Sequence, residues 1–382
     1  MSRRQNDIMP NTSKIVLAAE QRIPYHVMQA VLRNNGLPSF RSWKKIPDIL
    51  LDWTREHPDE APPEETLMGI FKDHLIAGEK ALKTYCYEET EENPNLVWIV
   101  ERLKELNIEE NYFHETYPLP LDSVSLSKVP KGCFPTKIFV QDKQIFVVFC
   151  SRRTYRMEED IDIPLDDKRF EGYSELVGIR MDQQQRFDCV VIDPISKVIQ
   201  FRIDAAGKPK NCNTNNDKSE EEARSIRPSF RDILLATEEL DKAFKKLLHS
   251  TTGYQVKYGE PWNLYEALRS FYDNEECCLI EIGFKTDGGA PTKTAKSRRI
   301  GQDIRKDRFH KGGSEAVEDK IDPYKVSVQW PKQLPHVELH IPGRVAMLNQ
   351  IIPVIDLALI NGCASEGEFS FVLQMLKKAI NQ

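Results

Sequence analysis

The stretch Pro135–Cys150, PTKIFVQDKQIFVVFC, decides the fold class of this chain. It contains two β-rich runs, Lys137–Val140 and Gln144–Cys150, separated by the short polar segment Gln141–Lys143. Two such runs around a short polar break are typical of a β-hairpin, whose strands are antiparallel. The stretch therefore predicts an antiparallel sheet in the middle of the chain.

Three further β-rich runs follow in the segment Glu175–Asp204. Two of them, Phe187–Ile192 and Val198–Ile203, flank Asp193–Ser196, which has proline at the second position of a turn. In the last run apolar and polar residues alternate, so we expect one buried face. Residues 119–205 are therefore predicted to form an antiparallel β module.

Upstream of this module, residues 1–118 have the periodicity of a helical domain. The clearest amphipathic stretches are Tyr25–Gly36, Pro47–Glu56, Leu67–Leu82 and Asn95–Leu106. The first two form either an ordinary helical hairpin or a helix-turn-helix whose basic residues contact phosphate.

Downstream, residues 206–223 (AGKPKNCNTNNDKSEEEA) are rich in Gly, Pro, Asn and charge and predict a linker or long loop. Residues 224–382 then mix predicted helices and strands. Helices are predicted at Ser229–Ser250, Trp262–Asp273 and Phe369–Ile380, strands at 277–284, 324–330 and 336–343, and a short helix followed by a strand within Arg344–Ile360. The prediction for the whole chain is an α+β fold: a helical N-terminal domain, a middle antiparallel β-rich module, and a C-terminal α+β domain with a basic insertion.

Composition limits the class of protein. The 382 residues are 40% hydrophobic and 29% charged, with a mean hydropathy of −0.50, which predicts a soluble chain with substantial cores. No apolar run approaches the roughly 18–20 residues of a membrane helix, and no apolar core follows Arg3 and Arg4 as a signal peptide requires. The eight scattered cysteines lack CxxC spacing, so we expect reduced thiols and a cytoplasmic location.

One segment, Pro291–Lys311 (residues 291–311, the basic segment), concentrates positive charge. It carries eight Lys/Arg against two Asp, within a chain whose formal net charge is −6. The basic residues are Lys293, Lys296, Arg298, Arg299, Arg305, Lys306, Arg308 and Lys311. Such a local excess attracts polyanions, and the phosphates of nucleic acid are the first candidates.

The basic segment is predicted to be an insertion between two strands, bracketed by the diglycines Gly288-Gly289 and Gly312-Gly313. Its second half, Ile300–Lys311, can form a helix whose isoleucines face the sheet and whose Lys/Arg side chains point outward. The basic segment is then either a phosphate-binding flap or a solvent-exposed loop whose charges only keep it soluble. Aromatic residues are nearly absent from it, so stacking on single-stranded bases is not indicated.

Two weaker constellations suggest metal chemistry. On a strand, His336, Glu338 and His340 would share one face, and imidazole and carboxylate groups can ligate zinc, iron or manganese. The exposed face of an antiparallel strand explains the same pattern. Glu281 and Lys285 would likewise share a face and weakly resemble the carboxylate and lysine of a metal-dependent nuclease.

Recognisable catalytic and cofactor motifs are otherwise missing from the sequence. It has no GxxxxGK[ST], GxGxxG or GxSxG, and the adjacent Cys277 and Cys278 have no identifiable histidine partner. We therefore expect no cofactor and no assigned enzymatic activity.

The function that the sequence favours is binding. We expect a protein that contacts DNA or RNA phosphates through the basic segment, or a subunit of a multi-protein assembly that handles nucleic acid, such as a bacterial antiviral defence system. The alternatives are a metal-dependent nuclease or hydrolase, and a scaffold whose basic segment docks an acidic protein partner.

Overall fold

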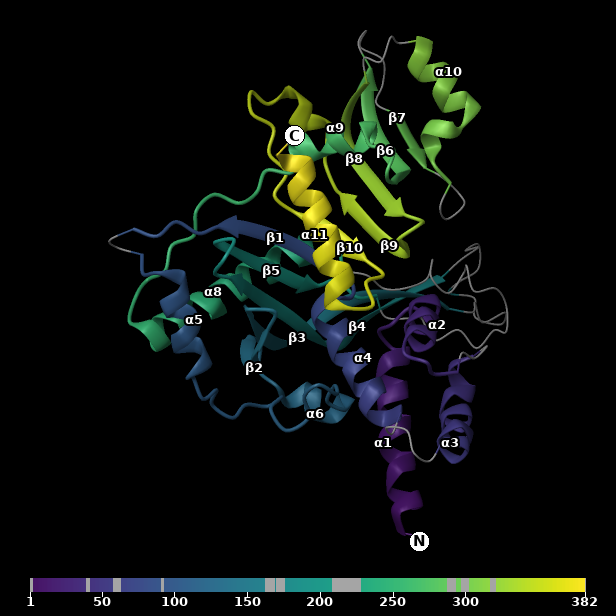
Figure 1. Cartoon of the computed structure of the whole chain (residues 1–382), viewed down its shortest axis with the longest axis vertical. Helices are drawn as coiled ribbons and strands as arrows, with labels where there is room; N and C mark the ends of the chain where they lie inside the picture. Colours follow the sequence, from purple (N-terminus) through teal and green to yellow (C-terminus); the bar gives the residue numbers. More distant parts are fainter. Residues whose placement is uncertain are drawn as a thin grey trace.

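The chain folds around one twisted antiparallel sheet (Figure 1). The computed structural model describes residues 3–38, 42–57, 63–90, 93–161, 169, 176–207, 228–286, 293–296, 302–316 and 321–381. Within these ranges the sheet has ten strands in the order β2-β3-β4-β5-β1-β10-β9-β8-β6-β7, and every pairing is antiparallel. The predicted α+β class is confirmed.

Two groups of antiparallel strands build the sheet; the first is a simple meander, whereas in the second β6 lies between β7 and β8. The first consists of β2 (Cys133–Gln141), β3 (Gln144–Ile161), β4 (Leu176–Asp193) and β5 (Val198–Asp204). The second consists of β6 (Cys278–Thr286), β7 (Lys293–Lys296), β8 (Ile321–Trp330), β9 (Leu334–Ile341) and β10 (Ala358–Asn361). The strand β1 (Lys80–Cys86) lies between β5 and β10 and joins the two halves. The sheet thus runs through all three segments that the sequence suggested as domains.

The predicted hairpin at the start of the first meander is confirmed. Gln141 pairs with Gln144, and Asp142 and Lys143 between them have φ of 48° and 67°. A two-residue turn with positive φ at both positions matches the right-handed twist of the flanking strands. The apolar run of β3 has no polar alternation because helices cover both of its faces.

Helices lie on both faces of the sheet, and the alternation along β4 shows which face each one covers. Cys189 and Val191 belong to the core under α9 (Tyr265–Asp273) and α11 (Glu366–Ile380). Val190 and Ile192 belong to the opposite core, under α5 (Leu96–Lys104) and α8 (Phe230–Thr252). The N-terminal helices form a third core against Cys150 and Phe187; they are α1 (Arg3–Glu20), α2 (Tyr25–Asn34), α3 (Ile46–Glu56) and α4 (Pro63–Ala77).

The prediction of a helix over Leu67–Leu82 is wrong at its C-terminal end. α4 ends at Ala77, and β1 starts at Lys80 after a tight turn at Gly78. A Cβ at Gly78 would lie 2.5 Å from the ring and 2.6 Å from the carbonyl oxygen of His74, so the turn requires glycine. Helical periodicity continued across this turn by chance, and only the pairing of β1 with distant strands shows the change.

The first meander ends in a two-stranded ribbon. β2 pairs with β3 only as far as Ser151, and β5 pairs with β4 only from Asp193 to Cys189, whereas β3 and β4 stay paired to Ile161 and Leu176. We call this extension, Ser151–Ile161 with Leu176–Arg186, the β ribbon. Residues 208–223 of the predicted linker lie outside the described residues.

Candidate nucleic-acid interface

The basic segment is a structured part of the C-terminal half of the sheet. Its first described residues form β7, which pairs with β6 so that Lys296 lies opposite Glu281 and Lys293 opposite Phe284. A short 3-10 turn, η3 (Ile304–Lys306), and the helix α10 (Arg308–Ala316) follow it. The helix begins later than the sequence suggested, since Asp307 separates it from η3. Gly312 and Gly313 lie inside α10, and Gly288 and Gly289 are outside the described residues.

Arg305 points into the protein, which corrects the expectation that it faces solvent. Its guanidinium donates hydrogen bonds to the carbonyl oxygens of Tyr272 (2.9 Å), Asn274 (2.6 Å) and Cys277. It also donates to both carboxylate oxygens of Asp303, at 2.9 and 2.8 Å. The carbonyls at a helix C-terminus have no partner within the helix, and Arg305 supplies donors at the end of α9. Arg305 is therefore an anchor, and its charge is already compensated.

Apolar contacts attach the same segment to the sheet. Ile304 is 6% exposed, which confirms that it faces inward. The ring of His310 lies 6.4 Å from Tyr272 and 6.1 Å from Phe284, both in edge-to-face geometry. These contacts and the Arg305 bonds hold η3 and the start of α10 in one position.

Three cations of the segment are exposed: Lys306, Arg308 and Lys311. Because Asp303 is paired with Arg305, only Asp307 opposes these three charges within residues 302–311. The backbone places Lys293 and Lys296 on β7, beside this group, and the predicted contacts Arg298 and Arg299 lie outside the described residues. The exposed positive charge is therefore concentrated on η3 and α10.

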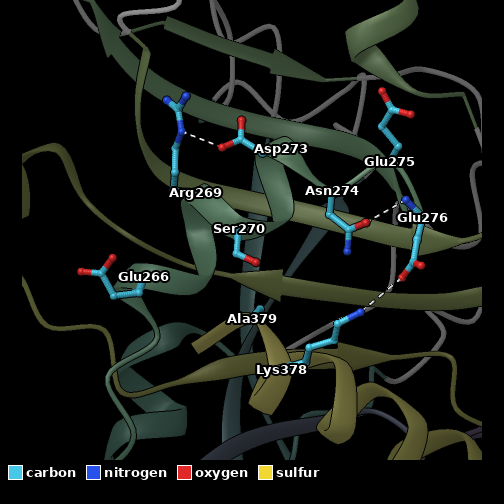
Figure 2. Close-up of a pocket in the computed structure, with 9 residues that line it drawn as sticks. All are labelled: Glu266, Arg269, Ser270, Asp273, Asn274, Glu275, Glu276, Lys378 and Ala379. Atoms are coloured by element: carbon cyan, nitrogen blue, oxygen red, sulfur yellow. Dashed lines mark hydrogen bonds and ion pairs between the residues drawn. The ribbon is translucent and has the colours of Figure 1, made fainter. Parts of the chain in front are cut away.

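A surface hollow of about 560 Å³ lies between α9, the residues that follow it, and the C-terminal end of α11 (Figure 2). Within it Arg269 pairs with Asp273 at 2.9 Å, and Lys378 of α11 approaches Glu276 at 3.8 Å. Four carboxylates and two bases line it; the residues are Glu266, Arg269, Ser270, Asp273, Asn274, Glu275, Glu276, Lys378 and Ala379. Its net negative lining disfavours a phosphate ligand.

The structure places Glu281 and His340, which the sequence treated separately, on either side of Ser327. Glu281 lies directly opposite Ser327, and Ser327 lies opposite His340, on three neighbouring strands. Ser327 Oγ and His340 Nδ1 share a hydrogen bond of 2.7 Å, and Lys325 Nζ donates to Glu281 at 2.5 Å. Ser327 was missed because a lone serine in the alternating run YKVSVQW gives no signal of its distant partners.

This row has the groups of a nucleophilic dyad but not the access. Serine and histidine within hydrogen-bond reach can form an activated nucleophile. The Ser327 side chain is 0% exposed, however, so a substrate cannot approach its oxygen. The row is best explained as hydrogen-bonded packing on the polar face of the sheet.

The suggested metal ligands have other partners. His336 Nε2 lies 3.1 Å from the carboxylate of Glu368 in α11, whereas His340 bonds Ser327. In the part of the chain that the structure describes, no group of three or more His, Cys, Asp or Glu could hold a metal ion. Lys285 lies opposite Asp322 on β8. Metal binding and nuclease activity remain untested predictions without geometric support.

Cys277 and Cys278 do not have the environment of reactive thiols. Burial raises the pKa of Cys277 to about 11 and also raises the pKa of Cys278. The thiolate is the nucleophilic form, so a raised pKa disfavours the reactive form of both groups. Packing at the start of β6 is the role that their environment supports.

Comparison with known proteins assigns no family: the chain matches no protein-family model and no curated protein. Among the described helices, none has the length and apolarity needed to cross a membrane.

Proposed function

We propose that this protein binds nucleic acid by contacting phosphates with the exposed cations of η3 and α10. The proposal rests on the hydrogen bonds of the inward-pointing Arg305 guanidinium to the carbonyls at the end of α9 and to Asp303. These bonds fix the backbone that carries the exposed side chains of Lys306, Arg308 and Lys311. Charges held in place lose less conformational entropy on binding than charges on a free loop. The Arg305 hydrogen bonds also argue against the basic segment being only a solvent-exposed loop.

The expected mode of binding is sequence-independent. Lysine and arginine contacts to phosphate position a protein on nucleic acid but carry no base information. The chain has a formal net charge of −6, so repulsion elsewhere confines binding to the neighbourhood of this segment. Affinity should therefore be modest and should fall steeply with salt.

A charge-reversal variant tests the proposal. Lys306, Arg308 and Lys311 are changed together to Glu, and binding to duplex and single-stranded DNA and RNA is measured at several salt concentrations. We expect the slope of log K against log salt to lose about 0.9 for each phosphate contact removed. The matched control changes Lys242, Lys245 and Lys246 on α8, which are exposed, carry the same charge and lie far from α10 (Figure 1). Equal loss in both variants, or no binding by the unmodified protein, would overturn the proposal.

A second feature supports the idea that the protein works in an assembly. Ile351, Ile352 and Val354 are 100%, 73% and 49% exposed in the loop between η4 (Val345–Asn349) and β10. Adjacent exposed apolar side chains mark protein contact sites more often than scattered single ones. We therefore propose a protein partner at this loop, within an assembly such as a bacterial antiviral defence system. Ile351→Ser with Ile352→Ser should leave the melting temperature unchanged and should abolish the association with that partner; retained association would contradict it.

We also propose a cytoplasmic location. The seven cysteines that the structure describes are all free thiols, which matches a reducing compartment. Fractionation of the cells that make the protein would test this location.

A further inference from the structure

The helix α8 packs on the sheet with one side, and its other side faces solvent. Its buried apolar residues recur every three or four positions and belong to one core; they are Ile233, Ala236, Leu240, Phe244 and Leu248. An amphipathic helix normally carries polar residues on the opposite side. Leu234 and Leu235 lie on that side instead, and they are 40% and 50% exposed.

Two opposite charges flank this pair of leucines. Arg231 lies three residues before Leu234, and Glu238 lies three residues after Leu235, so the four residues share one side of the helix. Both charged side chains are exposed, and neither forms an ion pair with another described residue. We call Arg231, Leu234, Leu235 and Glu238 the α8 stripe.

The apolar part of the α8 stripe is not covered by any described segment of this chain. Phe230, one turn before Leu234, is 36% exposed and widens the apolar area. Adjacent exposed apolar side chains mark protein contact sites more often than scattered single ones. The segment 208–227, which precedes α8 in the sequence, contains Ile226 as its single large apolar residue, so its composition does not complement two leucines. The α8 stripe therefore suits a second polypeptide chain.

The order of the four residues is self-complementary. When two α8 helices pack antiparallel about a two-fold axis between Leu234 and Leu235, the leucines of both copies meet at the centre. Arg231 of each copy then lies opposite Glu238 of the other, and the axis forms both ion pairs at once. Parallel helices would bring the two Arg231 side chains together, and likewise the two Glu238 side chains. The charge pattern thus selects the antiparallel arrangement.

We propose that the α8 stripe is an interface between two copies of this chain. Packed helices approach to about 8–10 Å, at which distance leucine side chains interdigitate. Four leucines and two ion pairs make a small interface, and small interfaces give weak association. We therefore expect a monomer–dimer equilibrium in the micromolar range. Salt should weaken it only modestly, because the leucine contacts are not screened.

The equilibrium is measured by sedimentation velocity on the full chain, without nucleic acid, from micromolar to near-millimolar concentration. The double variant Leu234→Ser with Leu235→Ser should weaken the dimer by about a hundredfold, since four half-exposed leucines per dimer lose their burial. These side chains are exposed in the monomer, so the melting temperature of dilute protein should not change.

Two charge variants test the antiparallel register. Arg231→Glu alone and Glu238→Arg alone each place like charges opposite one another, so each should weaken its own dimer by about tenfold. An equimolar mixture of the two variants should form a heterodimer as stable as the unmodified dimer, because every reversed charge then meets its opposite. Lys246→Glu, an exposed position later on α8, is the matched control and should dimerise normally.

The outcomes also separate this inference from the proposed function. The Glu variant of Lys306, Arg308 and Lys311 should dimerise normally even if it loses nucleic acid. A concentration-dependent dimer that is lost in the leucine variant and restored in the mixture supports the interface. A monomer at every concentration, a dimer that the leucine variant leaves intact, or a mixture as weak as either charge variant alone would refute the inference.

Discussion

The variant Arg305→Lys distinguishes two roles of Arg305: a structural anchor and a contact to phosphate. Lysine keeps the positive charge, so a residue that only faced phosphate would tolerate the change. Arg305 instead uses a planar fork to reach the carbonyls of Tyr272, Asn274 and Cys277 and both oxygens of Asp303. A lysine ammonium cannot serve these acceptors together, since its three donors radiate from one nitrogen.

The size of the effect follows from the bonds that are lost. Hydrogen bonds from a charged donor contribute about 1.5–3 kcal/mol each when they are buried. The Arg305 side chain is 17% exposed, so water replaces some of them and lysine retains others. A net loss of two such bonds gives a decrease of about 3 kcal/mol in the free energy of unfolding. Urea denaturation of Arg305→Lys, compared with the unmodified protein, measures this quantity.

Binding should change in a distinctive way in the same variant. Without its anchor the segment loses its fixed position, so we expect affinity for nucleic acid to fall by about tenfold while the salt slope stays the same, because the number of phosphate contacts does not change. Lys306→Gln is the matched control: stability should stay within about 0.5 kcal/mol, and the salt slope should lose about 0.9. If Arg305→Lys has unaltered stability and unaltered binding, Arg305 is not an anchor and the positioned-segment argument fails.

Three further predictions concern the buried interior. Glu366 is 4% exposed and forms a two-bond ion pair with the buried Arg202. Glu366→Gln should lower the free energy of unfolding, measured by urea denaturation, by about 3–5 kcal/mol because it leaves the Arg202 charge unpaired. The double variant Arg202→Met with Glu366→Leu should recover most of this loss, and an equal loss in both variants would contradict the pairing argument. Burial lowers the pKa of His74 from 6.5 to about 4, so at acidic pH the unfolded chain binds a proton that the folded chain does not. This group should therefore leave the free energy of unfolding unchanged above pH 6.5 and lower it by about 3 kcal/mol as the pH falls towards 4. Denaturation at pH 7 and pH 4.5 should show this loss, and His74→Gln should show a smaller one. Gly78→Ala should lower the melting temperature by several degrees because its Cβ would clash with the His74 carbonyl, and an unchanged melting temperature would show that the turn relaxes.

Local patterns in the sequence predicted most of the elements. The alternating and continuous apolar runs around Gln141–Lys143 predicted an antiparallel hairpin, and the helical spacing in Ser229–Ser250 predicted α8, because period two and period 3.6 are properties of neighbouring residues. The charge of the basic segment was visible for the same reason. These inferences required no knowledge of which distant segments meet.

The functional arrangement depended on contacts between distant residues. Arg305 turns inward because the carbonyls at the end of α9 lie within its reach, about 30 residues away in the chain. Ser327 joins Glu281 to His340 only through the pairing of three strands. A list of charged residues does not distinguish a cation that caps a helix from one that faces solvent, because desolvation and pairing are set by the surroundings.

The α+β class, the β-rich middle and the place of the basic charge were therefore predictable from local sequence patterns. Contacts between distant segments were needed to show that β1 joins the two strand groups into one sheet and that Arg305 is an anchor. The physical reason is that secondary structure follows local periodicity, whereas strand pairing and burial depend on residues far apart in the chain.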